Sequence, residues 1–181
     1  MSDTARKLHL GCGHEIWPGW INLDLAQLPG VDIAHDIQKM PWPFESESLD
    51  RISAHQLLEH VEYIPVLREA HRVLRKGGTF EIAVPHFTSR NNWIDPTHIK
   101  SFSIRTFEFF VKDSRFGRDY YFDFAFRRLL SQRLVFEKGF LLYNYLVEPL
   151  VNLHPKIAVL YEATFLRSLF PAESVVVELE K

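Results

Sequence analysis

Two glycines and two acidic residues have the types and the spacing of a nucleoside-binding site. Gly11 and Gly13 flank Cys12 directly after a short apolar segment, and Asp24 and Asp36 stand near the ends of the next two apolar segments. Glycines at the carboxyl end of a strand let the backbone pass close to a ligand. A carboxylate at the end of the following strand can accept hydrogen bonds from a ribose diol. A tight turn without a ligand would explain the glycines alone, but with the two acids the pattern favours an adenosine-containing ligand.

The glycine pattern also separates two classes of cofactor. A dinucleotide site needs a third glycine and a helix whose N-terminus holds pyrophosphate, but that third position is Ile16. Only six residues separate Gly13 from Trp20, whereas a crossover that contains a helix needs about 10–12 residues. A ligand without pyrophosphate fits better, which favours S-adenosylmethionine and disfavours a nicotinamide-dependent redox enzyme.

The elements that must position these residues alternate between strands and crossovers. Helical spacing of apolar residues over 67–75, followed by Lys76-Gly77-Gly78, predicts a helix that stops at the glycines. A second helix is expected over 103–112, and residues 139–167 have a helical pattern that Pro149 and Pro155 should break. The expected strands are 7–10, 20–25, 31–37, 49–54, 79–85, 129–137 and 174–180. This order predicts an α/β fold, a Rossmann-like doubly wound, mostly parallel seven-stranded sheet with a shortened first crossover.

Composition narrows the class of protein. The chain has 181 residues, of which 46% are apolar, so we expect one folded domain over 1–181 rather than disorder. Of 15 phenylalanines only Phe44 and Phe80 precede Glu81, which suggests an aromatic cap or lid insertion around 113–170. A net charge of −2 argues against a nucleic-acid partner. With one cysteine, no targeting segment and no apolar run long enough for a transmembrane helix, a cytoplasmic protein is expected.

Taken together, the motifs resemble those of small class I S-adenosylmethionine-dependent methyltransferases. The resemblance covers about residues 7–110, and its order is more specific than any single motif. It rests on Leu10-Gly11-Cys12-Gly13, Pro18-Gly19-Trp20, Asn22-Leu23-Asp24, Asp36, Pro41-Trp42-Pro43-Phe44, Leu49-Asp50, Leu58-Glu59-His60 and Arg72-Val73-Leu74-Arg75-Lys76-Gly77-Gly78. Asp95-Pro96-Thr97-His98 is similar to a segment in relatives often placed near glycan-biosynthesis enzymes.

The resemblance implies roles for residues at these matching positions. Gly11, Cys12 and Gly13 should border the methionine part of S-adenosylmethionine, and Asp24, next to Leu25, should bind the ribose hydroxyls. Asp36, together with the backbone of Ile37, should meet the adenine. His55, just past the fourth strand, should lie beside the methyl donor. Cys12 is not expected to be a nucleophile, because no base is placed beside it and a small buried cysteine is the common case.

The catalytic candidates are histidines at strand ends and in the segment that holds Asp95. If the methyl acceptor is a hydroxyl, His98 oriented by Asp95 is the first choice of base, with His86 and His55 behind it. His60 is more plausibly a capping or supporting group than a catalytic one. His86, Asp95 and His98 could converge on a cation, but their spacing matches no compact metal motif, so no metal site is expected.

The acceptor and the partners are less defined. The resemblance suggests a small molecule, with a sugar or nucleotide sugar as one option. The alternative is a non-catalytic S-adenosylmethionine-binding module that regulates or scaffolds another protein. Aromatic residues over 102–126 more often belong to a core, but those over 120–126 are too many for the inner face of one strand, so some could line an acceptor pocket or a homodimer contact. Residues 139–151 could instead meet a membrane interface, but they lack a run of cations, which favours a packed cap helix.

Overall fold

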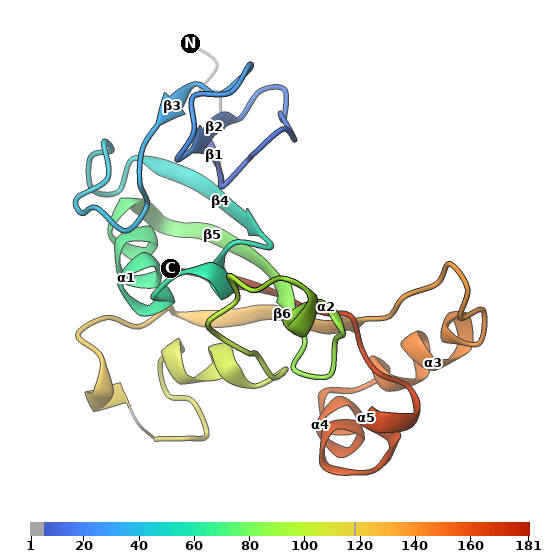
Figure 1. Ribbon diagram of the computed structural model, residues 1–181. Helices are drawn as coiled ribbons and strands as arrows, with labels where there is room; N and C mark the ends of the chain where they lie inside the picture. Colours follow the sequence, from blue (N-terminus) through green and yellow to red (C-terminus); the bar gives the residue numbers. More distant parts are fainter. Residues whose placement is uncertain (1–5, 118) are drawn as a thin grey trace.

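A seven-stranded sheet forms the centre of the molecule. A computed structural model describes residues 6–117 and 119–181, and its strands lie in the order β3-β2-β1-β4-β5-β7-β6 (Figure 1). The strands are β1 (Lys7–Leu10), β2 (Ile21–Asp24), β3 (Ile33–Ala34), β4 (Leu49–His55), β5 (Leu74–Pro85), β6 (Arg128–Val135) and β7 (Ser174–Glu180). The α-helices are α1 (Tyr63–Val73), α2 (Asn91–Ile94), α3 (Asn144–Val151), α4 (Pro155–Ala163) and α5 (Leu166–Leu169). Short 3₁₀ turns are η1 (Leu58–His60), η2 (Thr106–Phe110) and η3 (Asp119–Tyr121).

The sheet is mixed, and the prediction of a mostly parallel sheet holds for β1 to β5 but not for β7. Strands β1 to β5 pair in parallel, whereas β7 runs antiparallel to both β5 and β6. Val135 at the end of β6 pairs with Ser174 at the start of β7. Residues 136–173 therefore leave the sheet at the end of β6 and re-enter it beside the same end. A chain that returns in this way makes β6 and β7 antiparallel.

The shortened first crossover is confirmed. Residues 11–20 join β1 to β2 without a helix. The Asn22 side chain holds this loop in shape: its Oδ1 accepts from the Trp17 backbone at 2.9 Å, and its Nδ2 donates to the Trp20 carbonyl at 3.1 Å. The Trp17 ring stacks on His9 with their centroids 3.9 Å apart. The loop therefore covers the polar face of β1 in place of a helix.

The glycine pair after α1 does not end the helix as predicted. The helix ends at Val73, and β5 begins at Leu74, which pairs with Leu49 of β4. Gly78 lies inside the strand, where an added Cβ would stand 3.0 Å from both the Arg75 and the Asp50 carbonyl oxygens. The strand therefore starts earlier because pairing with β4 outweighs the helical pattern, and Gly78 permits the close approach of the two backbones.

Two other predictions about helices need correction. Residues 103–112 contain only the 3₁₀ turn η2 rather than a full helix. Pro155 does begin a helix, α4, but Pro149 lies inside α3 and does not break it. The helix runs only to Val151 beyond this exposed proline, so little of the backbone ladder is lost.

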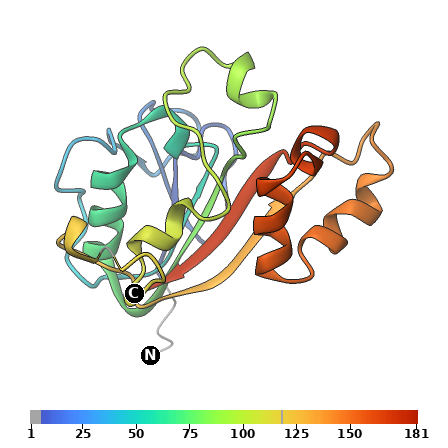
Figure 2. The ribbon, with the colours of Figure 1, turned by 90° about the horizontal axis from the view of Figure 1, so that it is seen from below.

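The helices flank the sheet in separate places. Figure 2 shows α1 on one flank of the molecule and α3, α4 and α5 on the opposite flank, beyond β6 and β7. The range 113–170, expected to be a cap, contains β6 and these three helices. Its action as a cap or lid stays a prediction. Within residues 6–117 and 119–181, no helix has the length and apolar character needed to cross a membrane.

Candidate functional site

Parallel pairing brings the predicted cofactor residues to one edge of the sheet. Leu10 at the end of β1 lies between Leu23 of β2 and Ala54 of β4. The glycine turn, Asp24 and His55 therefore leave the sheet at the same edge. In open α/β sheets this edge binds ligands where the strand order reverses, here between β1 and β4.

Asp24 fixes the glycine turn. Its Oδ2 accepts from the Gly13 backbone at 2.8 Å, and its Oδ1 accepts from the Ala26 backbone at 2.9 Å. Gly11 and Gly13 both have positive φ, 64° and 51°. Each carboxylate oxygen retains a lone pair for a further donor. The side chain can therefore hold its own loop and still accept hydrogen bonds from a ligand.

The other predicted cofactor residues surround this turn in different ways. Cys12 is buried. Burial raises the pKa of its thiol, and the negative charge of Asp24 raises it further. The thiol therefore stays protonated and packs as a small apolar group. Leu25 is exposed. Asp36 is half-buried and accepts from the Gln38 backbone at 3.0 Å. The Ile37 side chain lies in the core, so only its backbone is available to a ligand.

Of the four predicted catalytic residues, the structure keeps His98 and Asp95 together and gives His55 and His86 other partners. His55 Nε2 lies 2.9 Å from Glu81 Oε1 at the end of β4. His98 Nε2 lies 3.9 Å from Asp95 Oδ2 in the loop after α2. His86 is fully buried, and its Nε2 lies 2.9 Å from Glu162 Oε1 of α4. His86 therefore anchors α4 to the end of β5.

A cavity of about 260 Å³ opens beside the end of β4. It is lined by Gln56, Glu59, His60, Asn91, Ile94, Asp95 and His98. Potential ligand atoms of Glu59, His60 and His98 lie within 4.8 Å of one another. Burial raises the pKa of Glu59 to about 7, and the charge of Asp95 adds to that rise. Sequence reasoning missed Glu59, whose only signal was its place in Leu58-Glu59-His60.

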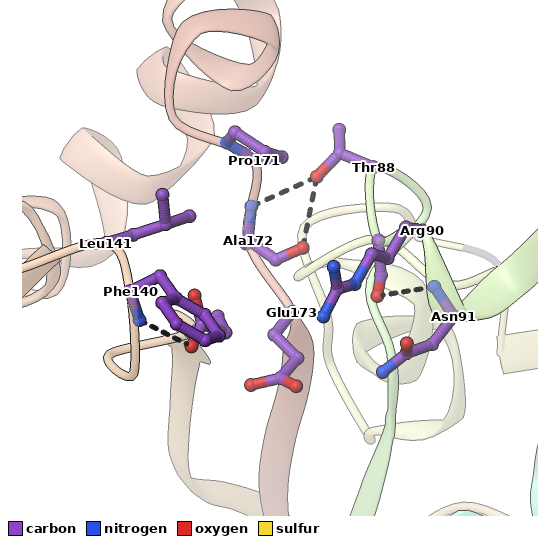
Figure 3. Close-up of a pocket in the computed structure, with 10 residues that line it drawn as sticks. Thr88, Arg90, Asn91, Phe140, Leu141, Pro171, Ala172 and Glu173 are labelled. Carbon is purple, nitrogen blue, oxygen red and sulfur yellow. Dashed lines mark hydrogen bonds between the residues drawn. The ribbon is translucent and has the colours of Figure 1, made fainter.

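A second cavity, of about 280 Å³, lies farther along the same edge of the sheet, between the ends of β5 and β6 and the start of β7 (Figure 3). It has a guanidinium, an amide and two carboxylates, from Arg90, Asn91, Glu137 and Glu173, beside the exposed ring of Phe140. Asn91 lies in the walls of both cavities. Sequence reasoning did not identify this cavity, because its walls come from three segments far apart in the chain.

Comparison with known proteins agrees with the geometry. Residues 8–82 match a family described as a methyltransferase domain. This match contains the glycine turn, Asp24, Asp36 and His55. No curated protein matches the chain.

Solved structures share the fold over almost the whole chain. A SAM-dependent methyltransferase from Archaeoglobus fulgidus matches with a TM-score of 0.65 and 19% identity, over 98% of this chain and 86% of the other. The YcgJ protein from Bacillus subtilis gives 0.58 and 16%, over 98% and 92%. A putative methyltransferase from Bacillus halodurans gives 0.57 and 16%, over 97% and 92%. At these identities the likeness concerns the fold.

The sheet, the turn and the matched residues define the class. The fold is the Rossmann-like α/β fold of these methyltransferases. The family match, together with that fold, supports an enzyme, an S-adenosylmethionine-dependent methyltransferase, with S-adenosylmethionine as its cofactor.

Proposed function

We propose that the chain transfers the methyl group of S-adenosylmethionine to a hydroxyl of a small molecule. The observation that carries this proposal is one sheet edge that holds the Asp24-locked glycine turn and two cavities that share Asn91 in their walls. In the proposed arrangement Gly11 and Gly13 border the methionine part and Asp24 binds the ribose. Asp36 and the Ile37 backbone meet the adenine.

The residues of the first cavity would handle the acceptor. When bound, S-adenosylmethionine supplies an electrophilic methyl group whose bond to sulfur breaks as the acceptor oxygen forms its bond to carbon. The walls must hold that oxygen about 3 Å from the methyl carbon and in line with the breaking bond. The hydroxyl proton must also leave, and His98, with Asp95 beside it, is the proposed base.

A polyhydroxylated acceptor such as a sugar or nucleotide sugar suits the second cavity. Carboxylates accept from hydroxyls, an amide both donates and accepts, and the Phe140 ring offers an apolar face. Figure 3 shows the Arg90 side chain reaching in from one wall toward Glu173, the residue before β7. Because Asn91 lines both cavities, a molecule seated here could extend a hydroxyl into the first cavity.

Calorimetric titration of S-adenosylmethionine tests the cofactor site. We expect wild-type binding and at least a tenfold weaker affinity for Asp24→Ala, since that change removes the ribose acceptor and the lock on Gly13. Asp123→Ala, an exposed aspartate paired with Arg68, is the control and should bind normally. Failure of the wild-type chain to bind would refute the proposal.

An acceptor screen that starts with nucleotide sugars and detects S-adenosylhomocysteine tests the reaction. For the acceptor it finds, His98→Ala should lower kcat by about 10²–10⁴-fold, the usual contribution of a positioned base. Full turnover by His98→Ala would show that this residue takes no part. Consumption of no acceptor, with binding intact, would favour a non-catalytic binding module.

We also propose a homodimer through the α3–α5 face, which consists of the exposed apolar side chains Phe140, Leu146, Leu150, Leu153, Leu160, Phe165 and Leu169. The same three helices enclose an apolar cavity of about 220 Å³. A two-fold interface requires one surface that carries both projections and a recess to receive them. The α3–α5 face has both, which supports a second copy of this chain as its occupant.

A further inference from the structure

We propose that Glu59, His60 and His98 form a binding site for a divalent transition-metal ion beside the carboxyl end of β4. Their ligand atoms lie within 4.8 Å of one another, on the wall of the first cavity. The site goes beyond methyl transfer itself, because binding of the ion requires neither S-adenosylmethionine nor an acceptor.

The backbone brings the three residues together although 37 residues separate His60 from His98. The Glu59 carbonyl oxygen in η1 accepts from the Ile99 backbone at 2.8 Å and from the Lys100 backbone at 3.3 Å. These bonds hold the loop after α2 against η1. The His60 and His98 rings then meet edge to face, with their centroids 4.6 Å apart. Main-chain hydrogen bonds therefore hold the three side chains close together, and their proximity is not a chance contact of surface side chains.

The Glu59 carboxylate has no cationic partner among the residues that the structure describes. Its side chain is fully buried, and neither carboxylate oxygen has a hydrogen-bond partner. Within the described part of the chain no lysine or arginine pairs with it, and the nearby Lys100 pairs with Glu62 instead, at 2.8 Å. A buried carboxylate without a partner is costly, and a bound cation removes that cost.

Thr97 orients the His60 imidazole by a hydrogen bond, and Asp95 faces the His98 ring at ion-pair distance. The Thr97 hydroxyl donates to Asp95 Oδ1 at 2.7 Å, so it must accept from His60 Nδ1 at 2.8 Å. His60 Nδ1 therefore carries the proton, and its Nε2 holds the free lone pair. The His98 ring turns Nε2 toward Asp95 Oδ2 at 3.9 Å, while its buried Nδ1 has no partner. Metal-bound histidines commonly face a carboxylate with the second ring nitrogen.

The donor set selects the class of ion. One carboxylate and two neutral imidazoles, with open positions toward a cavity, suit first-row ions such as Zn²⁺, Co²⁺ or Mn²⁺. Mg²⁺ prefers oxygen ligands and is the weaker candidate. Open positions toward the cavity leave room for an oxygen of another molecule.

If the proposed methyl transfer is correct, that oxygen belongs to the acceptor. A hydroxyl bound to a divalent ion has a lowered pKa, so it gives up its proton more readily to solvent. His98 would then act as a ligand instead of a base, and the variants below separate these two roles.

Equilibrium dialysis of the tag-free, chelator-treated chain against Co²⁺ tests the site. We expect one ion per chain and a visible spectrum typical of mixed nitrogen and oxygen ligation. Glu59→Gln and His98→Ala should each weaken binding at least tenfold. Glu62→Gln, three residues along, and His14→Ala, an exposed histidine, are the matched controls and should bind as the wild type does. Zn²⁺ and Mn²⁺ should displace Co²⁺.

Thermal melts without S-adenosylmethionine give the second readout. Co²⁺ should raise the melting temperature of the wild type and of Glu62→Gln but not of Glu59→Gln. The Glu59→Gln variant should fold normally, because glutamine has the shape of glutamate without the buried charge. Wild-type protein that retains no ion, or Glu59→Gln and His98→Ala that retain it equally well, would overturn the proposal. Calorimetry with S-adenosylmethionine on the same samples reports separately on the proposed function, so either can fail without the other.

Discussion

Gly11 and Gly13 share a left-handed backbone conformation but differ in their surroundings. An added Cβ at Gly11 would stand 2.7 Å from Leu57 Cδ1, whereas nothing lies within 4 Å of one at Gly13. A left-handed conformation costs an ordinary residue about 1–2 kcal/mol. We therefore expect Gly13→Ala to lower the free energy of unfolding by about that amount and Gly11→Ala to lower it further, because Leu57 must also move. Urea unfolding of both variants measures the difference, and equal losses would contradict it.

Residue chemistry could be predicted where it depends on neighbours in the sequence. The glycine turn and Asp24 were predicted from spacing alone, and the structure joins them by a hydrogen bond of 2.8 Å. His86 was proposed as a catalytic candidate from its position at a strand end, which gave no sign of its contact with Glu162, 76 residues away. Glu59 was missed for the same reason, since charged residues are usually exposed and only the fold shows that this one is not.

At the scale of elements, Glu162 connects α4 to two other segments. Burial would by itself raise the pKa of Glu162, but hydrogen bonds from His86, the Ile104 backbone and Ser103 outweigh burial and lower it. A carboxyl whose folded pKa lies below its unfolded value stabilises the fold above the unfolded pKa. That stability is lost as the pH falls through the folded pKa.

We therefore expect Glu162→Gln to lower the free energy of unfolding by about 1–3 kcal/mol at pH 7, because it weakens bonds to buried groups. The difference from the wild type should shrink as the pH falls below 4.5, the ordinary pKa of a glutamate side chain. Urea unfolding at several pH values between 7 and 3 measures this. Glu173→Gln, a half-buried glutamate near the same helices, is the comparison. A difference that stays constant over this range would contradict the role of Glu162.

Element boundaries were predictable where local patterns and strand pairing agree. β1 lies where the sequence placed it, at Lys7–Leu10, and β7 at Ser174–Glu180. The boundary between α1 and β5 was not predictable, because helix-ending signals at Lys76-Gly77-Gly78 compete with pairing of Leu74 to Leu49. That pairing joins two residues 25 positions apart, so no pattern local to residues 74–78 indicates it.

For the whole molecule, the missing first helix leaves one face of the sheet polar. Arg51 Nη2 lies 2.9 Å from Glu81 Oε2 and 3.6 Å from Glu178 Oε1, so the pairs run across β4, β5 and β7. Six residues between Gly13 and Trp20 indicated the short crossover in advance. The apolar surface of the molecule lies instead on the α3–α5 face, where the sequence showed only a surplus of apolar and aromatic residues.

This face carries the last prediction. If two copies associate through it, a charge placed at its centre should separate them, because a carboxylate buried against apolar side chains is costly. Leu150 on α3 lines the apolar cavity and is 63% exposed. We expect light scattering to give a dimer for the wild type and a monomer for Leu150→Glu at micromolar concentrations. Leu130→Glu, on the exposed side of β6, should remain dimeric. A wild-type monomer at all concentrations would refute the dimer, and binding of that monomer to lipid vesicles would assign the face to a membrane surface instead.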